Sequence, residues 1–280
     1  MEHLRTLSGM RRALSCLSVS LCFTILLFPA KLLADESTLM LGAGVGYNEG
    51  IFEGQDGYVY PEPVFNIDYG LLYANNSTVA IKFANYRSVS FALAATLGQI
   101  WLDVGDINSN REVLYYGIED RDRAVEAGLL FHYRSPVGLV SMAYYKDVSS
   151  THDASRGLIK IERNIAETGD YISITPGLYI NYYSSKYNKY YFGVTEEENL
   201  TGADIANNTP ENFSAFRPEY SPGNSGHLGF DLKVEYELSR EFVATGYLAI
   251  EDLTGQWETS PLVEDKGMGS VVFGISYRFQ

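Results

Sequence analysis

The sequence predicts an all-β protein, an antiparallel transmembrane β-barrel of about 12 strands, with about 10 to 14 as the range. Three observations predict this class: period-two alternation of apolar residues, a strand with one charged face, and an export signal at the N-terminus. Residues 268–280 show the alternation well, since Val271, Phe273, Ile275, Tyr277 and Phe279 share one face. Successive side chains of a strand point to opposite faces. The other face is small, polar or charged except at Val272, and it carries Arg278.

Residues 1–34 predict a secretory signal peptide. Arg5, Arg11 and Arg12 precede an apolar run over residues 13–29, and Ala34 offers a small residue for cleavage. A positive start, a short apolar centre and a small-residue exit are typical of such a signal. A retained membrane anchor is the alternative, although serines dilute the apolar run. We expect cleavage near Ala34 and one barrel domain over residues 35–280.

Both cysteines, Cys16 and Cys22, lie inside the predicted signal. The mature chain would therefore contain no cysteine. An exported chain without cysteine is not a small disulfide-stapled domain, so its stability has to come from a large hydrogen-bonded sheet or a sizeable core.

The charge balance excludes one class of partner. Residues 1–34 hold four of the 21 Lys and Arg and one of the 35 Asp and Glu, which leaves a net charge of −17 on the remainder. Such a surface repels phosphate backbones, so we expect no nucleic-acid binding.

The composition also predicts how the chain meets a membrane. Outside residues 1–34 no apolar run approaches the ~20 residues of a membrane helix, so strands would cross the membrane and contact its lipids. The 22 tyrosines suit the two interfaces of a bilayer. A soluble periplasmic β-sandwich would also alternate and is the alternative.

Strand patterns recur along the whole mature chain. Most segments alternate apolar residues with small, polar or charged ones, and short polar turns separate several of them. We expect strands at residues 39–47, 58–70, 71–85, 87–98, 124–133, 138–147, 157–163, 171–183, 227–238, 241–250 and 268–280.

Residues 227–238 argue most strongly for a water-filled interior. Asp231, Lys233 and Glu235 share a face with Glu237, and the opposite face is apolar throughout. Four charges on one face would be costly to bury in a sandwich core, so they need water. On the same reasoning the residues expected to face the lumen are Glu126, His132, Asp231, Lys233, Glu235 and Arg278.

Three connecting segments attract functional interpretations. The acidic run at 117–123 has arginines interleaved, which favours a solvated turn with local ion pairs over a calcium or acid–base site. Tyr187, Tyr190, Tyr191 and Phe192 predict an interfacial aromatic girdle, with a stacking platform for sugar rings as the alternative. Residues 195–224 lack periodicity and predict a long loop at the cell exterior.

Three motifs resemble a known family. They are Tyr191-Phe192-Gly193-Val194-Thr195, Ser260-Pro261-Leu262-Val263, and Gly274-Ile275-Ser276-Tyr277-Arg278-Phe279. Together they resemble the MipA/OmpV family, and the matching positions are Tyr191, Gly193, Val194, Ser260, Pro261, Val263, Tyr277 and Phe279. Two departures are Gln280, which follows Phe279 where the family ends on Phe, and a longer turn after His152.

The resemblance implies a β-barrel in the outer membrane of a Gram-negative bacterium. It also implies a scaffold that brings a lytic transglycosylase, which degrades murein, together with a bifunctional penicillin-binding protein. Other members are described as porin-like or as adhesins.

Three functions remain: a binding or scaffolding barrel, a narrow pore, and a barrel hydrolase. The hydrolase is least favoured because only His132, His152 and His227 remain after the signal, and none lies near a recognisable serine nucleophile. No His or Cys pair has metal-ligand spacing. We therefore expect a non-enzymatic protein with no catalytic residue, cofactor or metal.

Overall fold

The computed structural model describes residues 38–108, 111–168, 171–208, 217–253, 255–264 and 267–279. The predicted signal peptide and Gln280 lie outside the described residues. All statements below concern the described part of the chain, which falls within one compact unit, Glu36–Gln280.

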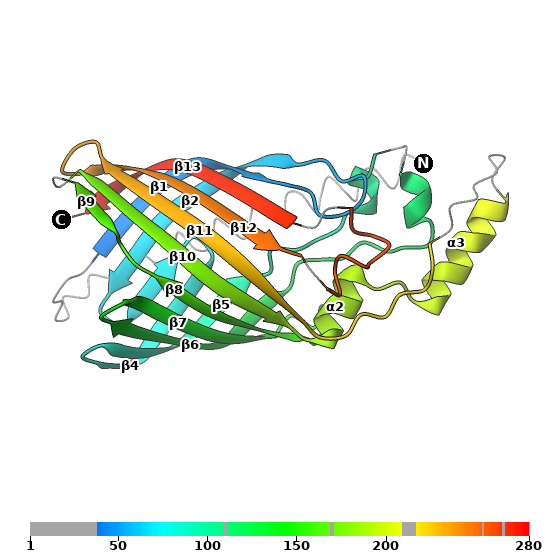
Figure 1. The fold of residues 1–280 in the computed structure, drawn as a ribbon, viewed down its shortest axis with the longest axis horizontal. Coiled ribbons are helices and arrows are strands. Elements are labelled where there is room, and N and C mark those ends of the chain that lie inside the picture. The colour runs from blue at the N-terminus through cyan, green and yellow to red at the C-terminus, as the bar shows by residue number, and fades with distance from the viewer. Residues whose placement is uncertain are drawn as a thin grey trace. The chain divides into compact units, whose positions relative to one another are not determined.

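The described residues form one antiparallel sheet that closes on itself (Figure 1). Its strands are β1 Thr38–Asn48, β2 Tyr58–Tyr69, β3 Leu72–Asn75, β4 Thr78–Tyr86, β5 Val89–Leu97, β6 Val125–Ser135, β7 Gly138–Asp147, β8 Ser155–Glu162, β9 Ala166–Thr168, β10 Ile172–Tyr183, β11 Ser225–Glu237, β12 Phe242–Asp252 and β13 Gly267–Phe279.

Neighbours in the chain pair with each other, and the barrel closes where β1 pairs with β13. The short strand β9 pairs with β10 on the same side as β8, so the two form one interrupted barrel strand. The barrel therefore has 12 strands, which confirms the predicted class and count.

The inner face of the barrel is small or polar, and the outer face is large and apolar. In β5, Ala92 and Ala94 are buried, whereas Phe91 and Leu93 are exposed. On β13, Phe273 is 67% exposed and Ile275 is 53% exposed. A soluble protein would bury such a band, so its exposure around a closed sheet is typical of a barrel whose outside meets lipid.

Close approach of backbones shapes the seam between β1 and β13. Gly42 pairs with Ser276, and a Cβ atom added to Gly42 would overlap the Ile275 carbonyl oxygen. Only glycine fits a position where two strands approach this closely. The glycines of the first strand therefore have a structural role in closing the barrel.

The predicted single strand at 71–85 is wrong in one respect, because the structure divides it into β3 and β4. The Asn75 side-chain oxygen accepts hydrogen bonds from the backbone N–H groups of Ser77 and Thr78 across 3.2 and 3.0 Å. An asparagine that bonds the backbone two residues ahead builds a turn without other help. The pairing of β4 with β5 also slips at Phe83, between Lys82 and Ala84, as a β-bulge.

Helices lie only in the long connections of the described chain. They are the 3₁₀ helices η1 Val104–Asp106 and η2 Glu112–Tyr115 and the α-helices α2 Ser185–Phe192 and α3 Glu196–Asn208. In Figure 1, α2 and α3 lie at the opposite end of the barrel from the C-terminus. None of the helices in the described ranges has the length and apolar character needed to cross a membrane.

The prediction that 195–224 is a loop throughout is therefore wrong over α3. Thr195 and Glu198 form a capping box: the Thr195 N–H donates to the Glu198 carboxylate, and the Glu198 N–H donates to the Thr195 hydroxyl. This reciprocal pair satisfies donors at the helix start, and three glutamates occupy the first turn.

Candidate functional site: a loop cap over a polar belt

The connections at one end of the barrel fold together into a structure that we call the cap. It comprises the described residues of 49–57, 98–124, 148–154, 184–224 and 253–266. These connections share one buried hydrophobic cluster, although up to about 200 residues separate its members. Isolated β-bridges join different connections at Phe52–Val263 and Gln55–Ile107, and two more, Leu102–Arg121 and Val194–Tyr220, fold a single connection on itself.

The aromatic residues of α2 form the centre of the cap. Tyr187, Tyr191 and Phe192 are at most 2% exposed, and the ring of Phe192 lies 4.1 Å from that of Trp257 between centroids. The predictions of an interfacial girdle or an open sugar platform are therefore wrong for these residues. Tyr187 and Tyr191 are four residues apart and Phe192 follows directly, which places the three on one side of a helix, and that side packs inward.

Polar bonds fix this aromatic cluster. The Trp257 indole donates to the Asn188 side-chain oxygen across 2.7 Å, and the Asn188 amide donates to the Gly223 carbonyl oxygen. The Tyr191 hydroxyl donates to the Asp122 carbonyl oxygen across 3.0 Å. Burial raises the pKa of Tyr187 and of Tyr191, so both phenols stay protonated.

The first two sequence motifs meet inside the cap. The Ser260 hydroxyl donates to the Phe192 carbonyl oxygen, and Val263 forms its bridge with Phe52. Gly193 ends α2, where an added Cβ would overlap the Lys189 carbonyl oxygen. Val194 is buried and Pro261 is partly exposed. These motif residues therefore hold the cap together.

The third motif lies elsewhere. Tyr277 and Phe279 are exposed on the outer face of β13, and their rings are 4.8 Å apart. They are placed to anchor the last strand at a membrane interface.

The predicted local ion pairs at 117–123 are replaced by a long-range contact. Arg121 pairs with Glu198 at the start of α3, and its guanidinium also lies over the Tyr190 ring. Burial raises the pKa of Glu198, but hydrogen bonds from Thr195 and the charge of Arg121 outweigh burial and leave that pKa below its ordinary value. The run at 117–123 thus fastens α3 to the rest of the cap.

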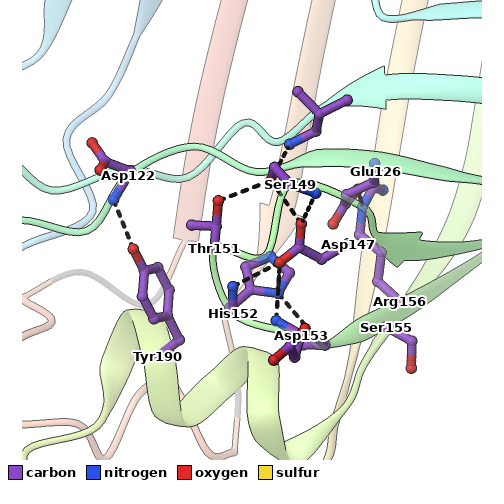
Figure 2. Close-up of polar contacts among 12 residues, drawn as sticks. Asp122, Glu126, Asp147, Ser149, Thr151, His152, Asp153, Ser155, Arg156 and Tyr190 are labelled. Carbon is purple, nitrogen blue, oxygen red and sulfur yellow. Dashed lines mark hydrogen bonds and ion pairs between the residues drawn. The ribbon is translucent and has the colours of Figure 1, made fainter.

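A turn beside α2 is organised by one carboxylate (Figure 2). Asp147 accepts hydrogen bonds from the backbone N–H groups of Ser149, His152 and Asp153, at 2.7, 2.7 and 2.9 Å. These bonds hold the longer turn after His152 that departs from the family pattern. The Asp147 carboxylate therefore accepts the hydrogen bonds that three backbone N–H groups at the base of the cap would otherwise make to water.

His152 fills the space between this turn and α2. Its ring lies 5.2 to 5.6 Å from those of Tyr187, Tyr190 and Tyr191, and its Nδ1 accepts a hydrogen bond from the Ala154 N–H. Burial lowers the pKa of His152, although the carboxylate of Asp147 opposes this. The residue is therefore a neutral packing group.

Two residues predicted to face the lumen occupy the barrel interior with partners that the sequence did not indicate. Glu126 is 0% exposed and binds the Arg156 guanidinium, and Asp231 is 3% exposed and lies 2.8 Å from the Lys160 ammonium. Glu251 is buried as well and accepts a hydrogen bond from the Asn181 amide. We call this set of interior charges, Glu126, Arg156, Lys160, Asp231 and Glu251, the polar belt. The register between strands creates these pairs, which the period of a single strand does not reveal.

The other predicted lumen residues lie nearer the end with short turns. Lys233 pairs with Glu235 at 3.1 Å, and Arg278 pairs with Glu237. His132 meets the Tyr73 ring edge-on at 5.2 Å. The structure does not gather the six predicted residues into one site.

Ser225 and His227 resemble a nucleophile and its base at first sight. The Ser225 hydroxyl lies 2.8 Å from His227 Nε2, and His227 Nδ1 lies 2.9 Å from the Asp252 carbonyl oxygen. However, His227 is 0% exposed beneath the Trp257 ring, and the Ser225 hydroxyl also accepts from Asn188. The pair lies within the packed base of the cap, and its position indicates a structural role. Within the described ranges no group of three or more His, Cys, Asp or Glu is arranged to hold a metal ion.

A closed antiparallel barrel of 12 strands, with an apolar outside and ion pairs inside, defines an outer-membrane β-barrel protein. A family model described as "MltA-interacting protein MipA" matches residues 41–279, and the chain belongs to this family.

Two relatives and one solved structure illustrate what the chain is similar to. The "MltA-interacting protein" of Escherichia coli (strain K12) is 23% identical over 245 residues, which are 87% of this chain and 91% of that protein. The "Putative outer membrane protein YiaT" of the same strain is 22% identical over 246 residues, covering 88% and 93%. The toluene transporter TbuX of Ralstonia pickettii matches 89% of this chain and 90% of its own, with 10% identity and a TM-score of 0.37.

The protein is therefore located in the outer membrane. Barrels of this kind keep their short turns and termini on the periplasmic side and their long loops outside. On this rule the cap faces the cell exterior, and the turns after β2, β4, β6 and β11 face the periplasm.

Proposed function

We propose that the protein is a non-enzymatic scaffold, a barrel anchored in lipid whose periplasmic rim binds a murein-degrading lytic transglycosylase and a murein-synthesising penicillin-binding protein. Membership of the MipA family and the relative named MltA-interacting protein support the first partner. The exposed apolar band on the strands supports the lipid anchor.

One observation carries the proposal. The periplasmic rim presents exposed apolar side chains at four separate points: Leu71, Val137 and Leu238 lie at its turns, Ile165 lies between β8 and β9, and all four are more than half exposed. Apolar residues grouped on a surface are a common sign of a protein interaction site. At the opposite end the cap has a buried, closely packed aromatic core, which favours a binding role over passage of solutes through the barrel.

Photo-crosslinking tests this assignment. A photoreactive amino acid at Val137 or Leu238 should give adducts that mass spectrometry identifies as a lytic transglycosylase and a penicillin-binding protein. The same group at Leu200, an exposed position on α3, should give neither adduct. Absence of both enzyme classes at all four rim positions would refute the scaffold.

A narrow channel is the second candidate, because paired charges such as Lys160 with Asp231 line the interior. In planar bilayers we expect small conductance steps or none, since the cap closes one end. Large and stable steps from the intact protein would favour the channel.

A further inference from the structure

A small cavity of about 90 Å³ opens at the periplasmic end of the barrel, away from the cap. Residues from β2 to β7 and from the turn between β4 and β5 line it, including Asp68, Lys82, Arg87, Ser88, His132 and Arg134. A single water needs far less room than this, so the cavity can admit a small chemical group.

The cavity is positively charged in a strongly acidic protein. Lys82 is buried and pairs with Asp68, so that cation is already compensated. Arg87 and Arg134 are exposed at the mouth, and neither forms an ion pair with a carboxylate in the described ranges. Among the lining residues three cations stand against one carboxylate, an excess of two positive charges in a sequence whose net charge is −14. The carboxylate of Glu162 also acts on His132, and it is compensated by its ion pair with Lys160.

An unpaired ring nitrogen lines the same cavity, and it is a donor in the Nε2–H tautomer. The Nε2 atom of His132 is buried and has no hydrogen-bond partner among the described residues. A buried polar atom without a partner costs free energy, and native structures keep few of them. A ligand oxygen at this point would supply the missing partner.

Irregular backbone surrounds the cavity. The β-bulge at Phe83 follows Lys82 directly, and Arg87 adopts φ of 52° in the turn. Bulges re-aim neighbouring side chains, and a non-glycine residue with positive φ is uncommon outside sites where the surroundings impose it. Both features act on residues that line the cavity.

We propose that this cavity is a binding site for a carboxylate group of a periplasmic ligand. Two guanidinium groups at the mouth match a carboxylate bidentately, and His132 offers a further donor from within. Asp68 and the acidic surface disfavour a doubly charged phosphate relative to a singly charged carboxylate. The site adjoins the turns that carry Leu71 and Val137, but it takes a small carboxylate and does not depend on which protein binds the rim.

Titration of the full-length barrel in detergent micelles tests the site. N-acetylglycine is the probe, N-acetylglycinamide is its uncharged match, and the reporter is the His132 ring signal in NMR, assigned with His132→Gln. The acid should shift that signal saturably, and the amide should not. Arg87→Asn combined with Arg134→Gln should weaken binding at least tenfold, and asparagine tolerates the positive φ at position 87.

Matched variants separate a built site from general surface charge. Arg240→Gln removes a cation from another periplasmic turn and should leave binding unchanged. Arg134→Lys keeps the positive charge but loses the planar guanidinium, and it should weaken binding less than Arg134→Gln. This pair of single variants provides a test if the double variant does not fold. Three results would each overturn the proposal. They are equal binding of the acid and the amide, a loss of binding in Arg240→Gln as large as that in the Arg87 and Arg134 double variant, and tighter binding of inorganic phosphate than of N-acetylglycine.

Discussion

Ser260 and Phe192 are 68 residues apart in the chain, and the Ser260 hydroxyl donates a hydrogen bond to the Phe192 carbonyl oxygen across 2.7 Å. The same hydroxyl accepts a hydrogen bond from the Leu262 N–H across 3.2 Å. Both residues are buried. One side chain therefore satisfies backbone groups of two different connections and ties the end of α2 to the last loop of the cap.

Ser260→Ala should loosen the cap and leave the barrel intact. The substitution leaves a buried carbonyl and a buried N–H without partners, at a cost of about 1–3 kcal/mol each. Hydrogen exchange should show faster exchange at the Leu262 amide, and strand amides in β11 to β13 should keep their protection. Ser221→Ala, an exposed serine of the connection that carries Phe192, is the control. Equal exchange in both variants would show that the Ser260 bond is dispensable.

Gly42→Ala should hinder closure of the barrel. The new methyl group would overlap the Ile275 carbonyl oxygen at the β1–β13 seam, and overpacking of this kind costs about 1–3 kcal/mol. We expect a lower yield of folded protein on refolding into lipid vesicles, measured by circular dichroism. Gly246→Ala on β12 is the control, because its methyl group would lie 3.5 Å from the nearest atom, on the Phe273 ring. A yield equal to that of the control would show that the seam adjusts freely.

Glu126→Ala should destabilise the barrel strongly. Glu126 is fully buried and bonds Arg156, so its removal leaves an uncompensated buried charge, at a cost of about 3–5 kcal/mol. The double variant Glu126→Leu with Arg156→Met removes both charges and should recover most of this loss. Urea unfolding of the barrel in lipid vesicles measures both effects. If the double variant is no more stable than the single one, the pair matters for more than its charge balance.

The strands were predictable because each carries its own period-two pattern. β13 shows this directly, with Phe273 and Ile275 facing out and Ser276 buried on the inside. The register between strands and the positions of the turns cannot be predicted from this pattern alone, as the division of 71–85 into two strands shows. The Asn75 turn was nevertheless visible, since Asn-Asn-Ser is a turn-forming sequence.

The cap was not predictable from local patterns, because contacts between distant segments create it. Phe192 ends an aromatic run at helical spacing, and nothing in its neighbourhood indicates that Trp257 would pack against it. The Thr195–Glu198 capping box was a readable signal for α3. Pairs such as Glu126 with Arg156 depend on which strands become neighbours, which the sequence of one strand does not contain.

Acid should release α3 from the cap before it affects the barrel. The pKa of Glu198 lies below its ordinary value of 4.5, because the bonds from Thr195 and the charge of Arg121 outweigh burial. The folded state therefore binds fewer protons than the unfolded state as this group titrates. Its stabilisation is present above pH 4.5 and is lost as the pH falls through the lowered pKa.

Limited proteolysis of α3 between pH 7 and pH 3, with an acid-tolerant protease, measures this loss. Cleavage should accelerate as the pH falls below 4.5, and Glu198→Gln should raise cleavage at pH 7 and flatten the pH dependence. Glu197→Gln, at an exposed neighbouring position, should behave as the native protein. An unchanged pH profile in Glu198→Gln would assign the acid sensitivity to another group, because Glu198 is the only member of the Thr195–Glu198–Arg121 contact that titrates in this range.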